Sequence, residues 1–101
     1  MDPIALAILS ILAVTAVIVI VELAILTIEW LMESFNSMKT GDRDEIGFTV
    51  KKALESGKYE VVQGVFNTNT ESIVDIKKIK TSQLDSSVEG FHSRHEVAIY
   101  G

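Results

Sequence analysis

Apolar residues fill the first part of the chain almost without interruption. The 18 residues from Ile4 to Val21 contain only two polar side chains, Ser10 and Thr15. As a helix this stretch would be about 27 Å long, close to the roughly 30 Å hydrocarbon core of a bilayer. The pattern therefore predicts a membrane-spanning helix that includes Ile4, Leu12 and Val21.

The predicted helix continues past the purely apolar stretch. No Pro or Gly lies between positions 3 and 41, so one helix over residues 1–38 is expected, with its second half next to the membrane. Trp30 then marks the membrane interface, where indole rings are enriched. A cleaved signal peptide is the competing interpretation. A retained signal anchor is favoured, because no basic side chain precedes the apolar run and the run extends well beyond any cleavage site.

Five polar residues follow one face of this predicted helix. Thr15, Glu22, Glu29 and Asn36 recur every seven residues, and Glu33 lies one turn after Glu29. Seven residues rotate a helix by about 700°, which returns nearly to the starting direction. The stripe has three interpretations. It faces water as the helix leaves the membrane, it packs against a partner subunit, or several copies turn it inward around a cation path.

The remaining sequence predicts a small α+β unit. Residues 39–47 form a charged linker, and residues 48–101 form the domain. Periodicity and turn residues predict a helix at 49–56, strands at 59–66 and 73–80, a short helix near 84–91 and a strand at 96–100. The expected fold class is thus a membrane helix plus an α-β-β-α-β domain with a three-stranded, mainly antiparallel sheet. The exposed edges of so small a sheet are suited to pairing with another chain.

Charge divides the chain in the same way. The net charge of the 101 residues is -5, but residues 1–38 carry four acidic side chains and no Lys or Arg. All nine basic side chains follow from Lys39 onward, against ten acidic ones. This bias predicts an N-terminus outside the membrane and a cytoplasmic C-terminal domain. Without a basic patch to neutralise phosphates, nucleic acid is not an expected partner.

No residue pattern indicates catalysis, a cofactor or a metal. The chain lacks Cys, which excludes disulfides and thiolate ligands. His92 and His95 stand three apart beside Glu96, but one such pair without further ligands at a recognised spacing is most simply a pair of loop histidines. We therefore expect no catalytic residues, no cofactor site, no metal site and no enzymatic activity.

These patterns favour a non-enzymatic, single-pass membrane protein. In the first hypothesis it is an accessory or scaffolding subunit that docks through its helix into a larger membrane complex and presents a small interaction domain. Its partners are the lipid bilayer and either other membrane-protein subunits or copies of itself. The alternative is a homo-oligomeric channel in which Glu22 and Glu29 line a cation path. A third hypothesis is a membrane-tethered module that binds a ligand.

Overall fold

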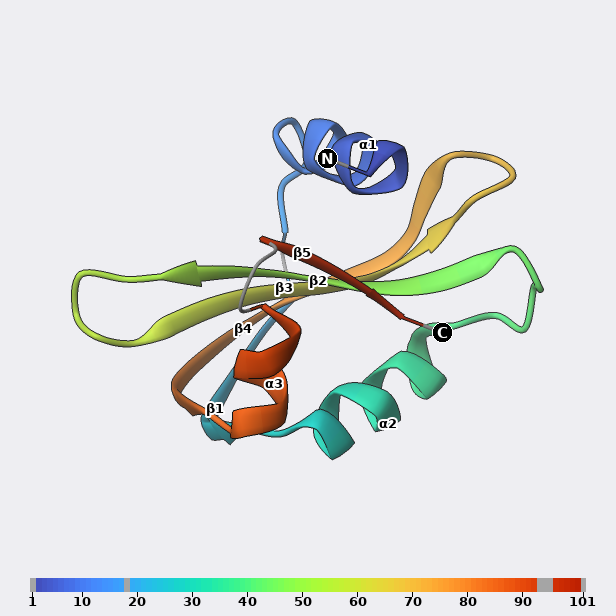
Figure 1. Cartoon of the computed structure of the whole chain (residues 1–101). Helices are drawn as coiled ribbons and strands as arrows, with labels where there is room; N and C mark the ends of the chain where they lie inside the picture. The colour runs from blue at the N-terminus through green and yellow to red at the C-terminus, as the bar shows by residue number, and fades with distance from the viewer. Residues whose placement is uncertain (1, 18, 93–95, 101) are drawn as a thin grey trace.

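Five strands form one mixed sheet, and short helices cover both of its faces (Figure 1). The computed structural model describes residues 2–17, 19–92 and 96–100. The strand order is β1-β4-β3-β2-β5, with β1 parallel to β4 and every other pair antiparallel. The strands are β1 (Ile20–Leu26), β2 (Glu45–Ala53), β3 (Tyr59–Asn67), β4 (Ser72–Leu84) and β5 (Val97–Tyr100), and the helices are α1 (Pro3–Leu12), α2 (Ile28–Met38) and α3 (Ser86–Phe91).

The prediction of one long membrane-spanning helix is wrong. The run from Ile4 to Val21 contains α1, a connection and the start of β1, and α2 follows as a separate helix. In the part of the chain that the structure describes, no helix is long and apolar enough to cross a bilayer. The expectations of a single-pass protein, a signal anchor and a cytoplasmic domain rested on that helix and are corrected with it. The β-branched residues Ile20 and Val21 favour a strand once β4 supplies a pairing partner.

The predicted fold class is wrong in the sheet as well. Instead of a helix at 49–56, the chain forms β2, which pairs with β3 from Glu45 opposite Asn67 to Ala53 opposite Tyr59. The spacing of Val50, Ala53 and Leu54 resembles a helix, but alternation from residue 46 onward dominates. The expected hairpin of 59–66 and 73–80 is present as β3 and β4, although the sheet has five strands and a parallel pair.

Helix α1 covers one face of the sheet by itself, above the strands in Figure 1. Ile8 of α1 packs against Phe48 of β2 and Phe66 of β3, and all three side chains are buried. Gly64 makes room for this aromatic pair, because a Cβ atom there would lie 2.5 Å from Cζ of Phe48. The α1 face of the core is therefore apolar and closely packed.

Helices α2 and α3 lie on the opposite face (Figure 1). Their main apolar cluster consists of Leu26, Leu31, Val61, Ile79, Leu84 and Val88. The side chain of Asp85 ties the starts of both helices together. Its Oδ1 accepts a hydrogen bond from the Val88 N–H (2.8 Å), and its Oδ2 accepts one from the Ile28 N–H (3.2 Å). This carboxylate caps two helices at once, since the first N–H groups of a helix lack partners within it.

Candidate functional site

Strand β1 is one outer strand of the sheet, and its side chains are unusually apolar for such a position. Among the residues that the structure describes, it has β4 on one side and no strand on the other. Val19, Ile20 and Ile25 remain 55%, 51% and 45% exposed. We call the outer side of Ile20–Leu26 the free edge. An edge strand offers unpaired N–H and C=O groups, which another chain can use for pairing.

The backbone of β1 alternates between β4 and the free edge. The Lys78 N–H donates to the carbonyl oxygen of Val19 at 2.8 Å, while Ile20 is the register partner of Lys78. In a parallel pair, a residue bonds to the neighbours of the one opposite, so Val19, Val21 and Leu23 direct their backbone groups toward β4. The regular pairing is interrupted at Ala24, and beyond it the Leu26 carbonyl oxygen accepts from the Asp85 N–H at 3.0 Å. The backbone groups of Ile20 and Glu22, and the N–H of Ala24, therefore face the free edge.

A shallow cavity of about 320 Å³ borders β1. Glu22 and Lys80 line it from neighbouring strands, where they are register partners. Lys58, from the turn between β2 and β3, contributes a second positive charge, and Ala24 forms part of the wall. The free edge is thus flanked by one carboxylate and two ammonium groups, which suits recognition of a partner segment more than chemistry on a substrate.

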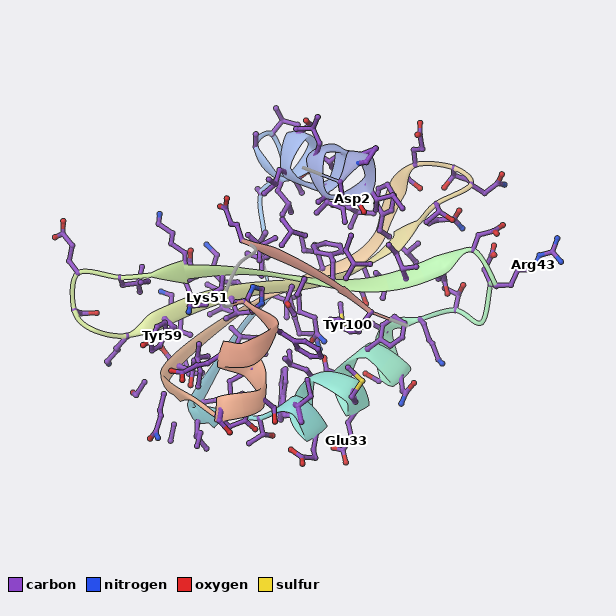
Figure 2. All side chains as sticks on the ribbon, viewed as in Figure 1. Asp2, Glu33, Arg43, Lys51, Tyr59 and Tyr100 are labelled. Atoms are coloured by element: carbon purple, nitrogen blue, oxygen red, sulfur yellow. The ribbon has the colours of Figure 1, made fainter. Side chains whose placement is uncertain are left out.

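Buried polar groups lie on the α2 face of the sheet. Gln63 is fully buried, and its Nε2 donates to the carbonyl oxygen of Leu31 and to the hydroxyl of Tyr100, each at 2.8 Å. Tyr100 also contacts the edge of the Phe35 ring, with ring centroids 5.5 Å apart, and Figure 2 shows it beside α2. Burial raises the pKa of Tyr100 to about 12, although the bond from Gln63 opposes the shift. This phenol stays neutral near pH 7 and joins β5 to β3.

One hydroxyl and one imidazole lie within hydrogen-bonding distance in the same layer. Oγ1 of Thr49 and Nε2 of His92 are 2.8 Å apart. Such a contact is the first requirement of nucleophilic catalysis, but a substrate must also reach the hydroxyl. Thr49 is fully buried, so the pair acts as an internal link between β2 and the end of α3. His95 lies outside the described residues, and within those residues no three His, Asp or Glu side chains gather as a metal site.

The residues of the predicted polar stripe occupy three different elements. Thr15 follows α1, where its Oγ1 donates to the carbonyl oxygen of Ile11 at 2.7 Å. Glu22 lies on β1, while Glu29, Glu33 and Asn36 are exposed on α2. Figure 2 shows Glu33 directed away from the sheet. A cation path lined by Glu22 and Glu29 required both on one helix, and these residues lie on β1 and α2 instead.

The residues expected within the membrane or at its interface have structural positions. Ile4 and Leu12 lie near the two ends of α1 and pack against its apolar cluster, and Val21 lies on β1. Trp30 of α2 packs against the cluster around Leu31, and Nζ of Lys77 lies 5.7 Å from its ring centroid.

Sequence reasoning did not find the free edge. The β-branched residues that resemble lipid-facing positions on a helix include Ile20, which is exposed on β1. Their one distinguishing signal was the density of Val and Ile over residues 17–21, which is typical of strands. Comparisons with known protein families, with curated protein sequences and with solved structures give no match to this chain.

Proposed function

We propose that this chain is a non-enzymatic interaction module that binds another polypeptide along the free edge of β1. The observation that carries the proposal is the exposure of Ile20 and Ile25 on an edge strand. Natural edge strands are commonly protected by Lys, Pro or inward charge, whereas β1 contains no Lys and no Pro, and Glu22 is its one charged residue.

The geometry of β1 supports strand addition as the binding mode. Seven residues give a longer template than the four of β5 at the opposite edge of the sheet. Backbone hydrogen bonds along such an edge supply affinity, and the side chains on either face supply specificity. The scaffolding role expected from sequence is thus retained, with the binding surface on a strand.

Site-specific photocrosslinking in cells that produce the chain tests this proposal. A benzophenone amino acid replaces Ile20, or replaces Val74 as an apolar, exposed control outside β1. We expect discrete protein adducts from position 20. They should disappear with Ala24→Pro, which removes an N–H that faces the free edge, and persist with Ala24→Thr, which keeps it.

Position 74 should give few adducts and should be insensitive to changes at Ala24. Equal labelling from positions 20 and 74 would contradict the proposal. Adducts from position 20 that survive Ala24→Pro would contradict it as well, because binding would then not use the backbone of the free edge.

A further inference from the structure

We infer that the segment bound along the free edge carries a Lys or Arg side chain directly opposite Glu22. The inference rests on the proposed function and states the chemistry of the partner. Three observations support it: the charges on the strands beside β1, the lack of an ion pair at Glu22 within the described residues, and the spacing of the strands. Glu22 is thereby the residue of β1 that selects the charge of the partner.

Charged side chains alternate in sign along one row that crosses four strands of the sheet. In register from β2 through β3 and β4 to β1, the members of this row are Lys52, Glu60, Lys80 and Glu22. Opposite charges directly across neighbouring strands stabilise a sheet, and like charges destabilise it. The row ends at Glu22 because β1 is an outer strand. The next position in the alternation, on a segment added to the free edge, is therefore positive.

The charged row lies on the face of the sheet where α1 packs. Val50 and Val62 pack against the apolar cluster of α1, and they lie two residues from Lys52 and Glu60. Residues two apart on a strand share a face, so the row runs beside the α1 contact. Glu22, at the end of the row, is exposed. A side chain from a bound segment can therefore reach its carboxylate.

The carboxylate of Glu22 has no ion-pair partner among the described residues. The ion pair on this face joins Nζ of Lys78 to Oε1 of Glu60 at 3.5 Å. Lys58 and Lys80 line the same shallow cavity as Glu22, but neither forms an ion pair with it in the described part of the chain. A basic side chain on the bound segment would supply the partner that the described chain does not.

Two lysines beside one glutamate also suggest the opposite case, in which the bound segment is acidic. Distance favours the basic segment. Neighbouring strands lie about 4.8 Å apart, so a side chain opposite Glu22 starts about 5 Å from Glu22 and about 10 Å from Lys80. Charges at the surface are largely screened beyond about 8 Å at physiological salt. Lys58 precedes β3, which lies one strand farther from the free edge than β4.

Glu22→Lys tests the charge in the photocrosslinking experiment with the benzophenone amino acid at position 20. We expect the adduct yield to fall at least about fivefold, because an opposite-charge pair becomes a like-charge pair, and Glu22→Gln to lower it about twofold. Glu33→Lys is the matched control, since it makes the same charge change at an exposed position on α2, and its yield should equal that of the natural chain.

Three results with these variants would overturn the inference. An unchanged yield from Glu22→Lys would show that the bound segment has no charge opposite Glu22. A higher yield would show that the segment is acidic and binds the lysines. Equal losses from Glu22→Lys and Glu33→Lys would show that net charge, rather than the contact at Glu22, controls binding.

The attachment point of the adduct tests the inference with Glu22 intact, which covers the case in which the variants do not fold. Positions 20 and 22 lie on the same face of β1, two residues apart. After digestion with chymotrypsin, which does not cleave at Lys or Arg, tandem mass spectrometry should find a Lys or Arg about two residues from the labelled residue. A labelled segment without Lys or Arg within about four residues would overturn the inference.

The outcomes separate this inference from the proposed function. If Ala24→Pro abolishes the adducts and Glu22→Lys leaves them unchanged, the interaction module stands and the selection of charge falls. If the adducts survive Ala24→Pro, the proposed function falls and this inference falls with it. Loss of the adducts with both variants, together with a basic residue near the attachment point, supports both.

Discussion

Two regions of the molecule bury their apolar side chains to different extents. They are the N-terminal segment, residues 2–26, and the meander formed by β2, β3 and β4. In the meander, polar residues interrupt the apolar ones every few positions, and Val74 is its one large apolar side chain among those most exposed. In the N-terminal segment the apolar residues are nearly continuous, and Val14 remains 87% exposed. Alternation assigns each side chain to a face, whereas a continuous apolar run leaves some of them in water.

The largest effect on stability is expected where α1 of the N-terminal segment packs against the meander. Phe48→Ala removes a fully buried ring that touches α1 and fills the space above Gly64. We expect the free energy of unfolding to fall by about 3–5 kcal/mol, because both the transfer energy of the ring and a cavity contribute. Urea unfolding followed by circular dichroism measures the change. A loss below about 1 kcal/mol would show that this contact does not hold the regions together.

A second variant tests the N-terminal side of the same contact. Ile8→Ala should lower the free energy of unfolding by about 2–5 kcal/mol, because Ile8 is fully buried against Phe48 and Phe66. Leu6→Ala is the matched control on the same helix. Leu6 is 56% exposed, so its loss should change stability by no more than about 0.5 kcal/mol. Similar effects of the two variants would mean that α1 does not dock as a defined face.

The smallest expected effect on stability concerns the buried polar groups on the face of the sheet that α2 covers. Burial raises the pKa of Tyr100 to about 12, against 10 in the unfolded chain. As the pH rises from 10 toward 12, the unfolded chain loses this proton first, so the tyrosine contributes a progressive loss of stability. Tyr100→Phe lacks that contribution and at pH 9 costs about 0.5–1.5 kcal/mol through the lost hydrogen bond.

Urea unfolding at pH 9 and pH 11 provides the measurement. The natural chain should lose more stability between the two values than Tyr100→Phe does, which narrows the difference between them. Parallel losses in both proteins would place the hydroxyl in water rather than beside Gln63.

The contrast between the regions also explains what could be predicted from the sequence. The hairpin of β3 and β4 could be predicted because alternation and the turn residues at 67–72 are local signals. The partner strand of β1 could not be predicted, because Ile20 pairs with Lys78, which is far away in the sequence, and no local pattern indicates that pairing. Uniform apolar content from Ile4 to Val21 is compatible with a membrane helix and equally with a helix followed by a strand. Tertiary pairing decides between them.

The candidate site, too, could be predicted only as far as local patterns reach. Glu22 was singled out as a polar position in an apolar stretch, and it lies on the strand that we propose as the binding surface. Its predicted companions, Glu29 and Asn36, belong to α2, because the chain leaves β1 at Leu26 and starts a new helix at Ile28. Residues spaced seven apart lie on one face only if they belong to one continuous helix.

The parallel pairing of β1 with β4 has a consequence for how the chain is made. A ribosome releases β1 first, and Lys78, the partner of Ile20, follows 58 positions later. The hairpins between β2, β3 and β4 close over short loops and are expected to form early, whereas the docking of β1 closes the longest one. Until then the most apolar part of the nascent chain is without its partner strand. The folding rate of the whole chain is therefore expected to depend on the docking of β1 onto β4.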